Sequence, residues 1–409
     1  MVTRVVVIGA GFGGLAACEA LADKPVEVTL VDRHNYNTFQ PLLYQVATAG
    51  LNPGDIAYPV RNYVKRHDNL RFREDLVSNV DLGEHLVHFA DGDPVGYEYL
   101  VIAAGAGTNF FGVTGAEAHA RAIYTMEDAV AVRNERAAAL ERAAAHGGGA
   151  RELTVVIVGG GPTGVEMAGT VAELTAMELE TTYPELDKSL ARTILLEQRD
   201  RLLGGFHERL GSYAEKVLEK SGVIVRCGVG VSEVASDHVV LSSGEIVPCG
   251  LVVWAAGVGG TSLTSALDLE SARGRLAVRP DLRVVGHDDI FAVGDAAAIS
   301  DGDGPLPQLA QPAIQGGGHA GKQILRLVGG QATEAFKYHD KGIMATVSRR
   351  AAVAQLPGGI RLTGTPAWFA WLGLHIFYLL GFRNRFAVLF NWAWRYLWWR
   401  HGPRVIVGA

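Results

Sequence analysis

The sequence predicts an α/β protein with two dinucleotide-binding domains, followed by C-terminal amphipathic helices. The prediction depends on a repeat within the chain: residues 4–9 (RVVVIG) and 153–159 (LTVVIVG) are short apolar runs that stop at glycine. Each run opens a glycine-rich turn and then an alanine-rich helical stretch. Each half later contains a second apolar strand that ends in small residues, at 99–109 and 251–260. Such self-similarity indicates two copies of one unit, and the alternating strands and helices indicate parallel sheets.

The composition agrees with a globular protein of several domains. Of 409 residues, 48% are hydrophobic and 20% charged, which excludes disorder, collagen and a coiled coil as the whole structure. The 51 glycines exceed the usual share and are typical of many turns between short strands. The three cysteines form no CxxC pair and the histidines show no metal-binding spacing, so we predict no metal site.

The first glycine-rich turn, at 9–14 (GAGFGG), contains the GxGxxG pattern of Gly9, Gly11 and Gly14 between a strand and a helix. Glycines there let the backbone approach a pyrophosphate, and the helix N-terminus offers N–H groups to the phosphate charge. Asp32 ends the next strand, 23 residues after Gly9, where a carboxylate can accept hydrogen bonds from ribose hydroxyls. Strand, helix and acid together favour a Rossmann-like nucleotide site over a plain glycine turn.

The second turn repeats the pattern with Gly159, Gly161 and Gly164, but its acid is further away. Glu197 ends the next strand 38 residues after Gly159, so we expect the extra residues, mostly 175–190, to lengthen the helix and add a loop. The residue after Glu197 is not an arginine that would receive a 2′-phosphate, although Arg199 is close, so we predict that NADH is preferred over NADPH. The alternative is that Glu197 is a solvated carboxylate at a strand end.

Two further acids follow the glycine motifs. We expect Glu166 in the first turn of the second helix, where it either partners the helix dipole or lies beside a nicotinamide. Asp295 ends the strand-like segment 289–295 (DIFAVGD), which can turn an Asp and a helix N-terminus toward a bound cofactor. The helical stretch 127–146 and the glycine run 147–149 separate the two copies, and we place a boundary there.

Taken in order, these motifs resemble those of the flavoproteins with two dinucleotide-binding domains and a glutathione-reductase-like fold. Within them the chain resembles the type II NADH dehydrogenases, which are single-subunit NADH:quinone oxidoreductases. The resemblance extends over nearly the whole chain and is most specific in four stretches, HNYNTFQPLLYQVATAGL at 34–51, GGGPTGVEMAG at 159–169, AQPAIQGG at 310–317 and GFRNR at 381–385. It implies a flavoenzyme that passes a hydride from NADH to non-covalent FAD and two electrons to a membrane quinone, menaquinone or ubiquinone, without pumping protons.

The resemblance also implies a division of the chain and a set of binding residues. FAD binds 1–120 and 266–340, NADH binds 121–265, and 341–409 anchors the protein to the membrane. The residues implied for FAD are Gly9, Gly11, Gly14, Asp32, Arg33, Ala104, Thr108, Asp295 and Ala313, and those for NADH are Gly159, Gly161, Gly164, Glu166, Glu197 and Gly257. Gln311 and Gln315 line the quinone site and, with Glu166, are the implied catalytic residues. Tyr44 and Gln45 face the flavin or the quinone, or pack in the core.

The last 69 residues differ in charge from the rest of the chain. Residues 341–409 contain nine Lys or Arg and no acid, and residues 366–401 hold six of the seven tryptophans. Two apolar runs around Arg383-Asn-Arg385 are each under 18 residues, too short to span about 30 Å of hydrocarbon. Aromatic residues with interleaved arginines suit helices that lie in the headgroup plane of an anionic membrane. We predict a monotopic anchor on the cytoplasmic face of the inner membrane; the alternative is a buried interface of a homodimer, which we also expect.

Three other functions compete with this interpretation. A sulfide:quinone reductase shares the fold but needs paired cysteines at the flavin, and Cys18, Cys227 and Cys249 are not placed for that role. A reductase of a soluble acceptor, ferredoxin or peroxide, would not carry the basic aromatic tail. A non-enzymatic NAD sensor or membrane scaffold could keep FAD for structure, but the AQPAIQ stretch speaks against it. No feature predicts binding to nucleic acid.

Overall fold

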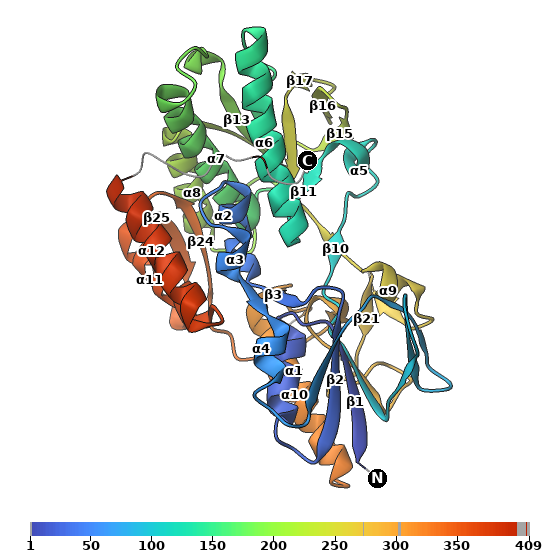
Figure 1. Ribbon diagram of the computed structural model, residues 1–409. Helices are drawn as coiled ribbons and strands as arrows, with labels where there is room; N and C mark the ends of the chain where they lie inside the picture. The colour runs from blue at the N-terminus through green and yellow to red at the C-terminus, as the bar shows by residue number, and fades with distance from the viewer. Residues whose placement is uncertain (1, 273, 302–303, 399–405, 407–409) are drawn as a thin grey trace. The chain divides into compact units, whose positions relative to one another are not determined.

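The computed structural model describes residues 2–272, 274–301, 304–398 and 406 (Figure 1). The contacts divide the chain into two compact units. The first consists of Met1–Thr38, Tyr58–Gly107 and Val258–Asp340, and the second of Phe39–Ala57, Thr108–Gly257 and Lys341–Ala409. Residues 399–405 and 407–409 of the predicted anchor lie outside the described residues.

The first unit is built on a five-stranded parallel sheet with the strand order β22-β9-β1-β2-β5. Its strands are β1 (Thr3–Ile8), β2 (Val26–Asp32), β5 (Leu70–Glu74), β9 (Tyr99–Ile102) and β22 (Ile290–Ala292). Helices α1 (Phe12–Leu21) and α10 (Ala310–Val328) lie side by side (Figure 1). Their contact is close because glycines face it: a Cβ on Gly317 would lie 2.0 Å from the carbonyl oxygen of Gly13.

Smaller elements complete the first unit. They are the helices α4 (Val60–Val64) and α9 (Ser262–Ala266), the antiparallel strands β6 (Val77–Asp81), β7 (Leu86–Phe89) and β8 (Val95–Gly96), and a second small sheet of β20 (Ser271–Ala272), β21 (Arg275–Ala277) and β23 (Ala297–Ala298). The central strands of the large sheet are buried on both faces, as expected of apolar runs in a parallel sheet.

The second unit repeats the plan with a parallel sheet in the order β11-β18-β12-β13-β14. Its strands are β11 (Arg121–Ala122), β12 (Thr154–Val158), β13 (Arg192–Glu197), β14 (Val223–Cys227) and β18 (Leu251–Trp254); its helices are α5 (Ala116–His119), α6 (Met126–His146), α7 (Pro162–Thr181) and α8 (Glu208–Lys220). An antiparallel sheet of β15 (Val231–Val234), β16 (His238–Leu241) and β17 (Ile246–Pro248) is added to it. The α/β fold with two parallel sheets is therefore confirmed.

The glycine run at 147–149 does not divide the two units, contrary to the prediction. Helix α6 and strand β12 both belong to the second unit. Gly147 ends α6 in the left-handed conformation (φ 78°), and this conformation is the common use of glycine after a helix. The insert at 175–190 does lengthen α7, which continues to Thr181 before a loop.

The C-terminal region packs within the second unit. Strands β24 (Ile343–Ser348), β25 (Ala351–Gln355) and β26 (Arg361–Thr363) form an antiparallel sheet, followed by helices α11 (Gly364–Tyr378) and α12 (Phe382–Trp398), drawn red in Figure 1. Strand β24 packs on α7, α11 on β25, and α12 on α3 (Pro53–Ile56), which follows α2 (Leu43–Ala47). Because α12 begins at Phe382, Arg383 and Arg385 lie in its first turn and not between two helices. Within the described residues no helix is long and apolar enough to cross a membrane.

Candidate functional site

The turn after β1 has the geometry of a phosphate cradle. Gly9 adopts φ +104°, and a Cβ there would lie 2.2 Å from the carbonyl oxygen of Ala103. A Cβ on Gly14 would lie 1.7 Å from the oxygen of Gly9. Gly11 precedes α1 without a side-chain cap, and nothing lies within 4 Å of where its Cβ would be. Open space in front of an uncapped helix start fits the pyrophosphate of a dinucleotide.

Asp32 is hydrogen-bonded to this turn and not to a distant partner. Its Oδ2 accepts from the backbone N of Ala10 at 2.6 Å and its Oδ1 from the N of His34 at 2.8 Å. Arg33 is exposed and donates to the His34 ring. The buried Asn37 donates to the backbone oxygen of Ala10 at 2.7 Å, so it also holds the turn, although no sequence pattern marks it.

The other predicted FAD residues lie at the carboxyl ends of neighbouring strands or pack against them, with one exception. Ala104 follows β9, and Asp295 follows β22 in a short 3₁₀ turn. Ala313 is buried in α10, and a Cβ on Gly294 would approach its methyl group to 3.3 Å. Because β22, β9 and β1 are adjacent and parallel, these residues share one edge of the sheet. The exception is Thr108, which begins a segment of the second unit.

The turn after β12 has the same glycine geometry and the same carboxylate hydrogen bond as the first turn. Gly159 adopts φ +111°, and a Cβ on Gly164 would lie 1.8 Å from its carbonyl oxygen. Gly161 precedes α7 without a side-chain cap and with open space around it. Glu197 Oε2 accepts from the N of Gly160 at 2.6 Å, the bond that Asp32 makes to Ala10 in the first unit. The predicted residue Gly257 follows β18 at φ +70°.

Glu166 lies in the second turn of α7, one turn later than predicted, because the helix begins at Pro162 and its first turn holds no acid. Its carboxyl is buried. Oε1 accepts from the backbone N of Thr346 at 3.1 Å and from the Thr346 hydroxyl at 3.4 Å. Burial raises the pKa of Glu166 to about 8, while the two Thr346 donors act to lower it. The neutral acid therefore predominates at pH 7.

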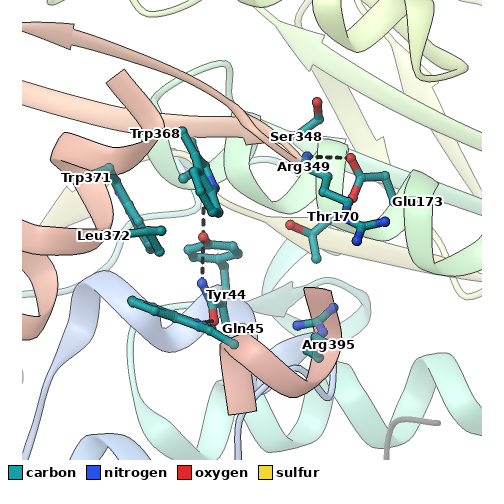
Figure 2. A pocket seen from close by; sticks show the side chains of 12 residues that line it. Tyr44, Gln45, Thr170, Glu173, Ser348, Arg349, Trp368, Trp371, Leu372 and Arg395 are labelled. Atoms are coloured by element: carbon teal, nitrogen blue, oxygen red, sulfur yellow. Dashed lines mark hydrogen bonds between the residues drawn. The ribbon is translucent and has the colours of Figure 1, made fainter. Parts of the chain in front are cut away.

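A small cavity, partly open to solvent, lies within the second unit and is lined in part by Thr346, the hydrogen-bond partner of this carboxyl (Figure 2). Its lining comes from α2, α7, α11, α12 and the end of β24. The lining residues are Tyr44 and Gln45 (α2), Thr170 and Glu173 (α7), Thr346 and Ser348 (β24), Arg349 (directly after β24), Trp368, Trp371 and Leu372 (α11), and Trp392 and Arg395 (α12). Glu173 accepts from the backbone N of Arg349 at 2.7 Å, and burial raises its pKa. The cavity thus combines indole rings with a few charged groups at its wall.

Trp371 and His375 form a stacked pair beside this cavity. Their ring centroids are 4.0 Å apart, and His375 Nδ1 donates to the backbone oxygen of Trp371 at 2.7 Å. Burial lowers the pKa of His375 to about 4, so the imidazole is neutral. The Trp371 indole nitrogen is buried with no acceptor at hydrogen-bond distance among the described residues. Neither residue was identified from sequence, because both lie in a run that predicted a membrane surface.

The predicted glutamines lie in the first unit, at the start of α10. Gln315 Oε1 accepts from the backbone N of His339 at 3.0 Å, and its Nε2 donates to the His339 oxygen at 3.0 Å and to Gln311 Oε1 at 3.4 Å. Gln315 is therefore engaged with the backbone, and Gln311 is held by Gln315. Tyr44, for which the sequence left packing and binding open, is buried in the second unit with its hydroxyl 2.9 Å from Thr346 Oγ1.

The cysteines and the acids form no other centre in the described residues. All three cysteines are free, and burial raises the pKa of the Cys18 and Cys249 thiols to about 12 and that of Cys227 to about 11. Such thiols are protonated and unreactive at neutral pH. No group of His, Cys, Asp and Glu among the residues described could hold a metal ion.

Comparisons with known proteins place these features in context. A family model described as pyridine nucleotide-disulphide oxidoreductase matches residues 3–317. The type II NADH:quinone oxidoreductases Ndh and NdhA of Mycobacterium tuberculosis are 36% and 39% identical, over 98% and 95% of this chain and 90% and 86% of their own lengths. The structure of NDH2 from Plasmodium falciparum in complex with NADH matches with a TM-score of 0.90 at 20% identity, covering 99% of this chain and 100% of that one.

Proposed function

The chain belongs to the type II NADH:quinone oxidoreductases, within the pyridine nucleotide-disulphide oxidoreductase family, and from this we infer that it oxidises NADH and reduces a quinone. The reaction balances as NADH, quinone and one proton giving NAD⁺ and quinol. Non-covalent FAD, when bound, relays the two electrons between NADH and quinone. The observation that carries the proposal is the pair of equivalent turns, each an uncapped helix start with an acid bonded to the turn, since the reaction needs two dinucleotides.

The first turn suits FAD because Gly9, Gly11 and Gly14 leave its helix start accessible to a pyrophosphate, and Asp32 stands at the ribose position. The second turn suits NADH for the same reasons, with Glu197 at the ribose position. Glu197 disfavours the 2′-phosphate of NADPH by charge repulsion, so NADH is the preferred donor. The remaining residues of the FAD and NADH sets that the resemblance implies are proposed with them.

For the quinone we propose the roles that the resemblance implies for Gln311, Gln315 and Tyr44, with Glu166 as the acid that supplies a proton. What supports Glu166 is its burial together with a pKa near 8, which lets it give and regain a proton at neutral pH. What supports the glutamines is that Gln315 fixes the orientation of Gln311. The three free, protonated cysteines argue against sulfide chemistry, which needs a thiolate pair.

We propose that α11 and α12 lie on the membrane and bring quinone to the protein. Large apolar side chains are exposed along both helices: Phe369, Phe377, Phe382, Phe386, Leu389, Phe390 and Trp394. Phe382 is 85% exposed, and the neighbouring Arg383 is exposed as well, the combination that suits an anionic headgroup layer. NADH is a cytoplasmic substrate, so we assign the protein to the cytoplasmic face of the inner membrane. A homodimer interface is the other use of the same face.

An anaerobic titration tests the function. NADH added to the purified flavoprotein should bleach the flavin absorbance, NADPH should bleach it weakly, and a short-chain quinone should restore it rapidly. Bleaching without recovery would refute the quinone as acceptor and point to a soluble one. Failure of NADH to bleach the flavin would refute the enzymatic assignment and favour the non-enzymatic sensor.

A further inference from the structure

A continuous series of buried hydrogen bonds joins the last helix of the second unit to Glu166. Trp392 Nε1 donates to Gln45 Oε1 at 2.7 Å, and Gln45 Nε2 donates to the Tyr44 hydroxyl at 2.9 Å. The Tyr44 hydroxyl lies 2.9 Å from Thr346 Oγ1, which lies 3.4 Å from Glu166 Oε1. Figure 2 shows the two bonds made by Tyr44 at the cavity wall. All five side chains are at most 9% exposed, so this relay is shielded from water.

The donor direction of the relay follows from its first member. An indole N–H can only donate, so Gln45 must present its oxygen to Trp392 and its NH₂ to Tyr44. The Tyr44 hydroxyl accepts from Gln45 and keeps its own hydrogen for Thr346 Oγ1. The single hydroxyl hydrogen of Thr346 then points to Glu166. A different amide orientation at Gln45 would reverse every later bond.

The direction of the relay decides how Glu166 is protonated. Oε1 receives two donors, the backbone N and the hydroxyl of Thr346. A carboxyl oxygen that accepts two hydrogen bonds is a poor place for a proton. The proton of the neutral acid therefore resides on Oε2, and Oε1 remains an acceptor in both protonation states.

We propose that Trp392 and Gln45 are positioning residues for Glu166, which they reach through Tyr44 and Thr346. They hold one carboxyl oxygen as an acceptor and leave the other as the single site of the exchangeable proton. The inference rests on the proposed function, in which one proton is taken up for each quinone reduced. Under this proposal the protonation site of Glu166 on α7 depends on how α12, the helix with the exposed aromatic side chains, packs in the second unit.

Other charged and titratable groups lie around the cavity. They are Glu173 of α7, Arg349 after β24 and Arg395 of α12, while His375 of α11 is neutral because burial lowers its pKa. None of the four belongs to the relay, so variants within it leave these charges in place. A shift in the titration of Glu166 then reports the relay and not a change in nearby charge.

The experiment reads the protonation of Glu166 directly by infrared difference spectroscopy of the FAD-loaded protein. The carbonyl stretch of the protonated carboxyl is followed against pH and assigned by its absence in Glu166→Gln. Thr346→Val removes the hydroxyl donor and should raise the midpoint by about half a pH unit, and Thr346→Ser should restore it. Trp392→Phe frees the Gln45 amide to turn and should raise the midpoint by a similar amount.

A double-mutant cycle separates positioning from loss of packing. The shift caused by Trp392→Phe should vanish in a Tyr44→Phe background, because the relay is already broken there. Trp394→Phe, the same change at an exposed position of α12, should leave the midpoint unchanged. A Trp392→Phe shift that persists undiminished beside Tyr44→Phe would overturn the proposal, as would no shift in Trp392→Phe when Thr346→Val moves the midpoint. Because the spectrum needs no quinone turnover, failure of the enzymatic assignment would be seen separately, in the wild-type titration.

Discussion

Replacing Gly169 with alanine tests how tightly α7 must pack on β24 to form the Glu166 environment. A Cβ at this position would lie 1.7 Å from the carbonyl oxygen of Val347 and 2.9 Å from its carbonyl carbon. An ordinary contact needs about 3.5 Å, so strand and helix must separate by roughly 2 Å. Val347 follows Thr346, whose backbone N–H donates a hydrogen bond to Glu166 Oε1 at 3.1 Å. That hydrogen bond cannot survive a movement of this size. Overpacking and a buried acid without donors together should lower the free energy of unfolding by about 3 kcal/mol.

Urea denaturation of the FAD-loaded protein measures the loss of stability, and NADH:quinone turnover measures the functional cost, which should exceed tenfold. The matched control is Gly318→Ala in α10, where nothing lies within 4 Å of the new methyl group. This control should be neutral or stabilising by up to about 1 kcal/mol, as alanine is in a helix interior. If Gly169→Ala were as stable and active as the control, the strand would yield without cost, and the argument from close packing would be wrong.

Three further predictions follow from the described contacts. Glu197→Gln should raise KM for NADH about tenfold and narrow the preference over NADPH, measured as the ratio of the two kcat/KM values; an unchanged ratio would remove Glu197 from donor selection. Because the folded pKa of Glu166, about 8, is above its ordinary value of 4.5, the native state holds a proton that the unfolded state has lost, and stability should fall by about 2 kcal/mol from pH 6 to 8 in urea titrations. Glu166→Gln should abolish this fall in the free energy of unfolding with pH. An equal fall in the variant would mean that another group titrates. The double variant Phe382→Asp and Phe386→Asp should lose sedimentation with anionic vesicles, while Phe111→Asp, at a phenylalanine as exposed as Phe386, should retain it; retained binding by the double variant would refute the anchor.

The parts of the molecule that could be predicted from sequence are those whose evidence is local. Each nucleotide turn is a strand, three glycines and a helix in immediate succession, and the acid follows at the end of the next strand. Asp32 and Glu197 were identified on this basis, and both bond to their turns. A local pattern can also place a residue wrongly by one turn. Glu166 was expected in the first turn of α7, because the helix start at Pro162 is not marked by a polar capping residue.

The cavity could not be predicted, because it is assembled from segments that are far apart in the chain. Thr346 reads as one more residue of a strand, and for Gln45 the sequence left binding and core packing open. Trp371 and His375 are spaced four apart in a run that looked uniformly lipid-facing, yet that face of α11 packs on the sheet and both rings are buried. Pattern alone shows that a helix is apolar all round but does not show which side meets protein.

The arrangement of the second unit also has a consequence for biosynthesis. Helix α7 leaves the ribosome long before the strand and the two helices that bury its acid, and synthesis proceeds at about 5–20 residues per second. Until Thr346, Trp371 and Trp392 have emerged, Glu166 stands on an uncovered helix surface, where no burial raises its pKa. A nascent or clipped chain can therefore possess both glycine turns and still lack the protonated acid. The protonated state of Glu166 therefore forms only after the C-terminal strand and helices have been synthesised.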